Sequence, residues 1–577
     1  MTFPIVAIGS SAGGLESLSE LLETVPSRPD MAFIVVQHLS AEHESFLSEL
    51  LGRKTQMSVQ TITDGMQVCP DHVYVIPPNT SLTINEDVLH LRERDRERPH
   101  HPADILFISL AEARADTAIG IVLSGGDADG ALGVQSIKQQ GGITFAQEPT
   151  SARFPSMPKN AIDTGCVDFV LRPKEIAREL GRLRSHAYLR GPPHQLPEEV
   201  RVGLDEETLG RIFRRLRAAH GVDFSHYKRS TIRRRLARRM AVRKVDALRE
   251  YLGVLEGDAA EVAALYQDFL IRVTHFFRDP QTFDALRSEI FPRLCEGRSA
   301  REPLRVWVPG CATGEEVYSI AIVLTEYLGD RLNQFRIQIF GSDLSEGAIE
   351  KARAGLYLNT IVEEVSPERL ERFFTKEDSH YRIARRLRDL CIFSRQDVTR
   401  DPPFSKLDLI SCRNLLIYLG ASIQRRVMHV FHYALRPSGL LMLGPSESVG
   451  AASELFDLVD KSNRFYTRKA TPTAALELGR SEDLANGRTE KQSSDADNNP
   501  VVTESAQRAA DRLLLSEYAP ASLLVDGALN ILQIRGETGR YLEFASGAPS
   551  LNLNRVSRPE LLIELSPAVA EARETGS

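Results

Sequence analysis

The first 130 residues contain three polar side chains of the types that catalyse acyl transfer. Ser11 lies in the glycine-rich sequence GSSAGG, His38 follows the apolar run AFIVV after one glutamine, and Asp129 lies in the turn SGGDADG. A serine on such a turn can expose its hydroxyl, a histidine can take its proton, and an aspartate can orient the imidazole. These residues predict a hydrolase with a Ser–His–Asp triad. They also fit a phosphate-binding glycine loop in which His38 and Asp129 cap helices.

A second stretch has the residue types of a nucleotide-like cofactor site. The apolar run Val306–Val308 is broken by Pro309 and Gly310, and small residues then lead through Gly314 into a helical pattern. A glycine-bearing turn at the carboxyl end of a strand lets a flat or charged cofactor approach the backbone. Asp343 follows the next apolar run, where an acid suits the ribose hydroxyls of an adenosine-type cofactor.

The side chains of each site can act together only if the strands that precede them end at the same edge of a sheet. Short apolar runs alternate with helical patterns over residues 4–146 and again over residues 304–443. Such alternation predicts parallel sheets with helices on both faces, whose strand-end loops lie at one edge. The predicted fold class is α/β, with two doubly wound, Rossmann-like domains joined by a helical domain. A small α+β segment is expected at the C-terminal end.

Changes in composition and periodicity divide the chain into six parts. Prolines and glycine interrupt any pattern in residues 186–203, and serine, asparagine and aspartate clusters mark residues 469–505 as a flexible linker. The predicted parts are the first α/β domain at 1–185, a linker at 186–203, the helical domain at 204–270, the second α/β domain at 271–468, a linker at 469–505 and the C-terminal segment at 506–577.

The bulk composition argues against several classes of protein. A net charge of −7 with 26% charged residues gives no overall attraction to nucleic acid or to an anionic membrane. No pair among the six cysteines has metal-site or redox spacing, so we expect reduced thiols and no metal centre. We find no secretory leader and no apolar run long enough to span a bilayer, which predicts a cytoplasmic protein.

One helical segment is strongly basic. Nine lysines or arginines lie within residues 228–244, and Ile232, Leu236 and Met240 form an apolar stripe at a spacing of four. A basic helix face attracts an acidic protein or nucleic acid, and without a nucleic-acid motif we favour the acidic protein. The alternative is a solvated helix whose arginines pair with nearby acids.

The first α/β domain resembles the catalytic domain of the protein-glutamate methylesterase family, CheB. The resemblance rests on GSSAGG, VVQHLS, LSGGDADGA and TFAQEPTSARFPSMPKNAI, and it covers nearly all of residues 3–183. It implies that Ser11 is the nucleophile, His38 the general base and Asp129 its orienting acid. It also implies that the backbone N–H of Gly126 is an oxyanion donor.

Residues 205–468 resemble the protein-glutamate O-methyltransferase family, CheR. The resemblance rests on TxFFRDP, GCATGEExYSIAI, CRNxLIY and LGxSES, with a helical segment before them. It implies S-adenosyl-L-methionine as the cofactor and a glutamate side chain as the methyl acceptor, with Arg278 and Tyr418 at the reacting centre. The residues that it assigns to the cofactor are Thr274, Arg278, Glu316, Asp343, Asp397, Val398, Arg413 and Asn414.

The chemistry of methyl transfer to a carboxylate agrees with these residue types. Glutamate is ionised near neutral pH, so the site needs no general base and has to align the carboxylate with the methyl group. Because the charges of carboxylate and sulfonium cancel in the transition state, a dry pocket favours the reaction. An arginine such as Arg278 can hold a carboxylate bidentately.

Two further segments resemble parts of related proteins. In the CheR family, a small antiparallel subdomain inserted where residues 356–392 stand can dock a receptor tail as an added strand. Residues 521–526 and 531–534 predict a β-hairpin, and residues 506–518 predict a helix. With residues 536–542 the hairpin resembles the start of a PAS sensor domain.

Together the resemblances imply a bifunctional chemosensory enzyme that methylates glutamates of a receptor-like or other signalling protein and hydrolyses the esters. They also allow a glutaminase activity and two-component signalling proteins as further partners, without nucleic acid or direct membrane insertion. The alternative is a regulatory scaffold with one or both sites degenerate. It is favoured by Asp127, where the CheB family usually has glycine, and by Arg272, where the CheR family usually has a small or amide residue. A methyltransferase for small molecules or nucleic acid is a third interpretation.

Overall fold

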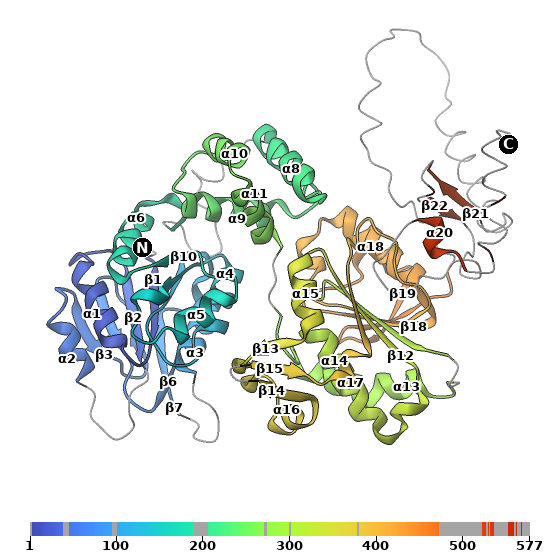
Figure 1. Cartoon of the computed structure of the whole chain (residues 1–577), viewed down its shortest axis with the longest axis horizontal. Helices are drawn as coiled ribbons and strands as arrows, with labels where there is room; N and C mark the ends of the chain where they lie inside the picture. The colour runs from blue at the N-terminus through green and yellow to red at the C-terminus, as the bar shows by residue number, and fades with distance from the viewer. Residues whose placement is uncertain are drawn as a thin grey trace, which may run out of the picture. The chain divides into compact units, whose positions relative to one another are not determined.

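A computed structural model describes most of the 577-residue chain. The described residues are 3–37, 46–94, 101–189, 206–270, 274–298, 302–377, 380–471, 522–526, 529, 531–535, 552–558, 561 and 567. The chain forms two compact units (Figure 1). The first contains Met1–His275 and Leu356–Ile383, and the second contains Phe276–Gly355 and Ala384–Ser577.

The first unit contains a seven-stranded parallel sheet in the order β10-β9-β8-β1-β2-β5-β3. Its strands are β1 (Ile5–Ser10), β2 (Ala32–Gln37), β3 (Ser58–Thr61), β5 (His72–Val75), β8 (Ala118–Val122), β9 (Ile143–Gln147) and β10 (Phe169–Leu171). A short antiparallel sheet beside it contains β4 (Met66–Gln67), β6 (Thr80–Asn85) and β7 (Val88–Glu93).

Helices cover both faces of the parallel sheet, so its strands are apolar on both sides. Alternate residues of β1 enter two separate cores. Val6 and Ile8 pack with residues of α1 (Gly14–Thr24) and α6 (Pro173–Ser185), whereas Ile5 and Ala7 pack on the other side. The helices of that second core are α3 (Pro102–Arg114), α4 (Ala131–Gln140) and α5 (Ser156–Asp163). The predicted doubly wound arrangement is confirmed here.

Four helices within residues 206–270 and a small sheet with one adjoining helix also belong to the first unit. The helices are α8 (Glu206–His220), α9 (Arg229–Arg243), α10 (Leu248–Gly257) and α11 (Ala259–Phe269). The small antiparallel sheet is built from β13 (Leu356–Leu358), β14 (Phe374–Glu377) and β15 (His380–Ile383), with α16 (Pro367–Phe373) beside it. An antiparallel insertion was expected at this point of the chain, and the structure contains one.

The second unit contains the sheet order β16-β12-β11-β17-β18-β20-β19. Its parallel strands are β11 (Leu304–Pro309), β12 (Ile337–Asp343), β16 (Cys391–Arg395), β17 (Leu407–Cys412) and β18 (Leu435–Leu443). An antiparallel edge follows with β19 (Phe456–Asp460) and β20 (Phe465–Arg468). The helices include α12 (Pro280–Ala285), α13 (Phe291–Cys295), α14 (Glu315–Leu328), α15 (Glu346–Ala354), α17 (Arg385–Arg388) and α18 (Ala421–Ala434).

The predicted C-terminal hairpin is present. Strand β21 (Ser522–Val525) pairs antiparallel with β22 (Ile531–Arg535), and the short helix α20 (Leu553–Val556) follows. The predicted helix at 506–518 and residues 536–542 lie outside the described residues, so the PAS-like resemblance stays a prediction. Within the described part of the chain, no helix has the length and apolar character needed to cross a membrane.

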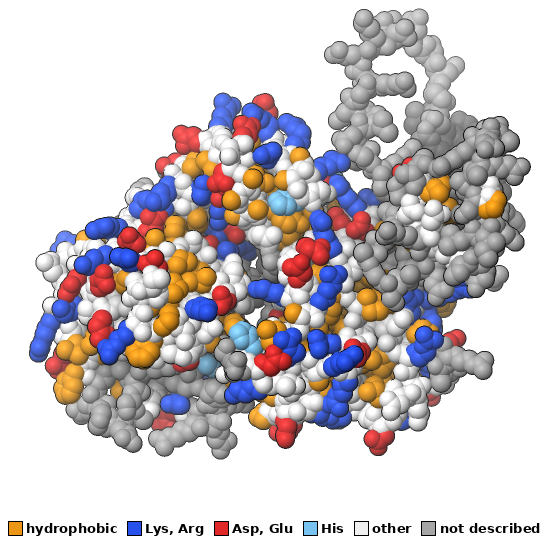
Figure 2. Space-filling model, in the orientation of Figure 1, with side chains coloured by type: hydrophobic (Ala, Val, Ile, Leu, Met, Phe, Trp, Pro, Cys, Tyr) orange, Lys and Arg blue, Asp and Glu red, His pale blue; other side chains and the backbone are white. Residues whose placement is uncertain are grey.

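The basic helix α9 differs from the expected docking face. Its apolar stripe is buried as predicted, but Arg235, Arg238 and Arg239 are buried too. Arg238 pairs with Asp168 and Asp268, as the alternative interpretation expected of these arginines, but the buried face is not the solvated one that this interpretation described. On the face seen in Figure 2, acidic and basic side chains are interspersed over α8 and α10.

Candidate active sites

Ser11 lies in the turn between β1 and α1, at the carboxyl edge of the first parallel sheet. Its backbone N–H donates to the carbonyl of Ser124 at 2.9 Å, and its carbonyl accepts the N–H of Gly14 at 2.9 Å. Gly13 has a φ of 69°, and a Cβ there would lie 2.9 Å from the Cβ of Arg153. The glycines therefore allow a tight turn and a close approach of the 153–154 loop.

Ser124 connects the Ser11 turn to the loop that contains Phe154. Its hydroxyl donates to the carbonyl of Ala12 at 2.9 Å and accepts the N–H of Phe154 at 3.0 Å. The N–H of Gly125 donates to the carbonyl of Phe154 at 3.0 Å. Sequence reasoning missed Ser124, although it lies within the motif LSGGDADGA.

Asp129 is fully buried and its carboxylate caps α3. Its two oxygens accept the backbone N–H groups of Ala103 and Asp104, each at 2.9 Å. The helix-cap interpretation of Asp129 is thus confirmed. His38 lies outside the described residues, so the role of Asp129 as its orienting acid stays a prediction.

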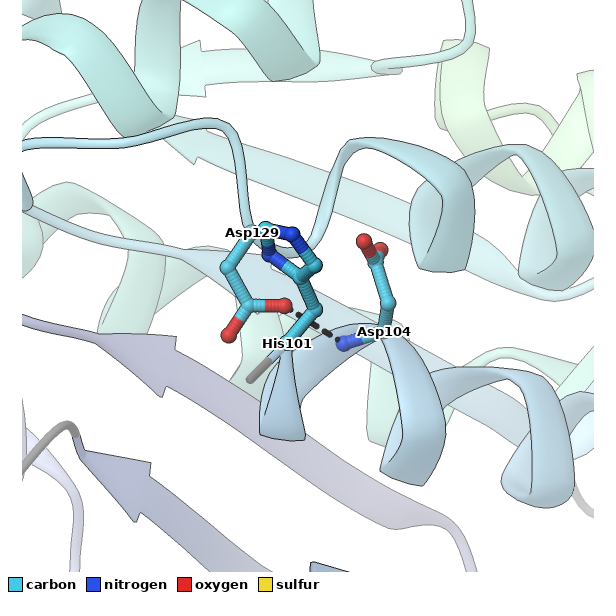
Figure 3. Close-up of side chains that lie close together, drawn as sticks. All are labelled: His101, Asp104 and Asp129. Carbon is cyan, nitrogen blue, oxygen red and sulfur yellow. Dashed lines mark hydrogen bonds between the residues drawn. The ribbon is translucent and has the colours of Figure 1, made fainter. Parts of the chain in front are cut away.

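Figure 3 shows His101 and Asp104 beside Asp129, a cluster that the sequence analysis missed. One potential ligand atom from each residue lies within 4.8 Å of the others, so these three side chains could hold a metal ion. Burial and the nearby charge of Asp129 raise the pKa of Asp104 well above its usual value. A proton on Asp104 would reduce the negative charge of the cluster.

Asp127 closes the turn that leads to Asp129. Its carboxylate accepts the N–H of Asp129 at 3.1 Å, and its carbonyl accepts a hydrogen bond from Asn160 at 2.9 Å. Its backbone lies outside the left-handed region, so the position does not require glycine. Such an Asx turn is a common way for aspartate to stabilise a tight turn.

A cavity of about 300 Å³ opens at the carboxyl ends of β2 and β5. The residues that line it are Gln37, Ile76, Pro77, Pro78, Asn79, Thr80, Arg94, His101, Pro102 and Asp127. Because β2 neighbours β1 in the sheet, the cavity lies at the same edge as the Ser11 turn.

In the second unit, Asp343 holds the glycine-rich turn after β11. Its carboxylate accepts the N–H groups of Ala312 at 3.0 Å and Ser345 at 2.8 Å. Gly314 has a φ of 95°, and a Cβ there would lie 2.9 Å from the Cβ of Ala352. The two sequence features that indicated a nucleotide-like cofactor are therefore in direct contact.

Arg413 joins three segments of the second unit. Its guanidinium donates to the carbonyl of Arg278 at 2.9 Å and to the carboxylate of Asp279 at 2.6 Å, and lies 3.3 Å from the carboxylate of Glu316. Ser411 donates a further hydrogen bond to Glu316. Burial raises the pKa of Glu316, although the charge of Arg413 opposes this. The structure thus brings Arg278, Glu316 and Arg413 together.

Asn414 and Tyr418 lie in the loop after β17. Asn414 has a φ of 59°, and Tyr418 ends a short helical turn that begins at Leu416. Glu447 is buried, and its carboxylate accepts the backbone N–H groups of this loop and of Gly444. Sequence reasoning did not single out Glu447, although it lies within the quoted LGxSES motif.

The remaining predicted cofactor residues are Asp397, Val398 and Thr274. Asp397 precedes Val398 in a turn where its carboxylate accepts the N–H and hydroxyl of Thr399. The N–H of Gln396 donates to the carbonyl of Asp343 at 3.0 Å, so this turn lies beside Asp343. Thr274 is half-buried and belongs to the first unit. Arg272 lies outside the described residues.

Three family models match successive parts of the chain. CheB methylesterase matches residues 6–180. The all-alpha domain of CheR methyltransferase matches residues 207–270, and the SAM binding domain of CheR methyltransferase matches residues 272–465.

Curated relatives cover the whole chain or one of its parts. An uncharacterized 104.1 kDa protein of Rhodobacter capsulatus is 34% identical over 547 residues, which are 92% of this chain and 57% of that protein. Chemotaxis protein methyltransferase 2 of Vibrio cholerae is 30% identical over 46% of this chain and 92% of its own length. A Leptospira interrogans protein named "Putative protein-glutamate methylesterase/protein-glutamine glutaminase" is 31% identical over 32% of this chain and 96% of its own length.

This chain therefore belongs to the CheB methylesterase family in its first part and to the CheR methyltransferase family, with its SAM binding domain, in its second.

Proposed function

We propose that this chain methylates glutamate side chains of a chemoreceptor-like protein with S-adenosyl-L-methionine and hydrolyses the resulting methyl esters. The observation that carries the proposal is the presence of both families' domains on one chain. Ser11 follows β1 of the first sheet and Asp343 ends β12 of the second, each at the carboxyl end of a parallel strand. We also propose that the reaction takes place in the cytoplasm, as is typical of the CheB and CheR families to which the two parts belong.

The second unit has a donor set that suits the cofactor. Two acidic side chains, Asp343 at the end of β12 and Glu316 in the first turn of α14, fit the ribose hydroxyls and the cationic sulfonium of S-adenosyl-L-methionine. The bound cofactor would supply an electrophilic methyl group. Arg278 would hold the acceptor carboxylate, and Tyr418 would position it from the adjoining loop. Because the acceptor is already ionised, these residues need to align it and exclude water.

In the first unit, Ser11 would attack the ester carbonyl while His38 takes the hydroxyl proton. The N–H of Gly126 would stabilise the oxyanion, and the open space where its Cβ would stand suits an approaching ester. The protonated His38 would then give its proton to the departing methoxide oxygen as the carbon–oxygen bond breaks, so that methanol leaves. A water molecule would hydrolyse the acyl-serine by the same route, which regenerates the serine and releases the glutamate.

One substrate can test both activities. A purified receptor cytoplasmic fragment is incubated with the chain and labelled S-adenosyl-L-methionine, and protein methylation and methanol release are followed together. Ser11→Ala should abolish methanol release and leave methylation intact, and Arg278→Ala should do the reverse on a pre-methylated substrate. Methanol release that is unchanged in Ser11→Ala would contradict the esterase assignment.

The scaffold alternative drew on Asp127 and Arg272. The hydrogen bond from the N–H of Asp129 to Asp127 supports an intact turn, so we favour an active esterase. A scaffold would bind the receptor fragment but show neither labelled methyl transfer nor methanol release.

A further inference from the structure

Helix α9 packs into the core of the esterase domain. Ala237 and Ala241 belong to the same apolar cluster as Leu180 and Leu183 of α6 and Val6 of β1. One apolar cluster thus contains residues of the central sheet, of α6 and of α9. Burial of apolar surface across the two domains is the main driving force for such association.

Arg238 is fully buried at the centre of this contact. It pairs with Asp168 of the esterase domain and with Asp268 of α11 at 2.6 Å, and its Nε donates to the carbonyl of Gly142 at 3.0 Å. Lys138 lies 3.3 Å from Asp168 and 3.6 Å from Asp268, so two cations face two carboxylates. Burial alone would raise the pKa of Asp168, but Arg238 and Lys138 outweigh it and hold that pKa below its usual range.

Each domain also supplies an arginine to the end of a helix in the other. Arg235 donates to the carbonyls of Lys138 and Gln139, at the C-terminus of α4. Arg182 of α6 donates to the carbonyl of Ala241 near the C-terminus of α9 at 3.0 Å. The partial negative charge at a helix C-terminus favours cations, so the two contacts are reciprocal caps. Burial lowers the pKa of Arg235 to about 10, which leaves it charged at neutral pH.

We propose that α9 is a docking element for the chain's own esterase domain, so that residues 3–189 and 206–270 act as one body and the buried arginine face is closed to external acidic partners. Replacing one partner of a buried ion pair by a neutral residue is strongly destabilising, because the other charge stays buried without its partner. The clustered arginines of α9 therefore bind selectively to the esterase domain, because Asp168 and the C-terminus of α4 lie where they can accept hydrogen bonds from them.

Cleavage of the full chain tests this proposal. A protease site is inserted within residues 190–205, the intact protein is purified and cut, and the fragments are examined by size-exclusion chromatography and titration. The cut fragments should elute together. Arg238→Gln should weaken their association by about 100-fold or more. The matched control is Arg229→Gln, since Arg229 is half exposed and its ion pair among the described residues lies within the helical segment, with Glu206 at 3.2 Å.

Several results would overturn the proposal. Separate elution of the unsubstituted fragments would do so, as would an Arg238→Gln dissociation constant within threefold of the unsubstituted one. If Arg238→Gln lowers helix content by circular dichroism, Asp168→Asn removes the same pair from the esterase side and should weaken association similarly. A fluorescent polyglutamate peptide should bind the uncut chain equally with and without Arg238. Binding that depends on Arg235 and Arg238 would show that the face is open.

Discussion

The carboxylate of Glu447 accepts the backbone N–H of Asn414 at 2.8 Å, and thereby fixes the start of the loop that ends at Tyr418. The same carboxylate accepts the N–H groups of Leu416 at 2.7 Å, Ile417 at 3.3 Å and Gly444 at 2.8 Å. One side chain therefore satisfies four backbone donors on two segments. Hydrogen bonds to a charged acceptor are stronger than neutral ones, so this contact should set the loop's conformation.

Glu447→Gln tests whether this loop positions the methyl acceptor. Each carboxylate oxygen accepts two of the N–H groups, so either orientation of the amide leaves two donors without an acceptor. We expect kcat for methyl transfer to fall about 10- to 100-fold, with a smaller change in the Kd for S-adenosyl-L-homocysteine. Glu454→Gln, at an exposed position nearby, is the control. A lower melting temperature with unchanged kcat would mean that Glu447 is only structural.

Ser124→Ala should weaken the esterase without affecting the methyltransferase. The substitution removes the hydroxyl that links Ala12 to Phe154, and its cost to stability is about 1 kcal/mol. Because the Ser11 turn loses one anchor, methanol release should fall several-fold while labelled-methyl incorporation stays the same. Ser136→Ala removes a hydroxyl that bonds only within α4 and serves as the control. Equal activity in both variants would exclude a role for this link.

Glu315 should make the second unit less stable as the pH rises. Burial raises its pKa from the ordinary 4.5 to about 7, so between these pH values the folded state holds a proton that the unfolded state has released. The contribution of this proton to the free energy of unfolding is therefore lost as the pH rises from about 4.5 to 7. Glu315→Gln should reduce this dependence by up to about 3 kcal/mol, measured by denaturant unfolding between pH 5 and pH 8. Glu350→Gln, at an exposed position, is the control. The assignment would be contradicted if the pH dependence of stability were unchanged in Glu315→Gln but altered in Glu350→Gln.

Asp127→Gly and Asp127→Asn test whether Asp127 stabilises the turn of an active esterase or marks a degenerate scaffold. Glycine loses the acceptor for the N–H of Asp129 and should destabilise the first unit by about 1 kcal/mol, whereas asparagine keeps an acceptor and should restore stability. Methanol release should change only a few-fold in either variant. A large gain of esterase activity in Asp127→Gly would instead support the degenerate scaffold.

The strand-end positions could be predicted because they depend on local periodicity. Ser11 and Asp343 each follow an apolar run, and this local pattern is enough to place them at a sheet edge. Asp343 then binds the neighbouring glycine turn, as two adjacent parallel strands require.

Contacts between distant segments could not be predicted in the same way. Glu447 acts on a loop that begins at Asn414, and Asp129 caps a helix that begins before it at Pro102. In the sequence, the arginines of α9 indicate a face for an acidic partner or a solvated helix, because the pattern does not show that Asp168 and Asp268 enclose one of them. Burial of a charge depends on partners that only the fold brings together.

The enclosure of Arg238 also determines how the chain should respond to salt. Dissolved ions screen pairs that face water, but they screen buried pairs much less. Arg238 and Asp168 are both fully buried, whereas Arg229 and Glu206 are half exposed. A high-salt purification step would therefore weaken the exposed ion pairs of α9 and leave the pair between Arg238 and Asp168 intact. Raising the ionic strength is thus a poor way to separate α9 from the esterase domain.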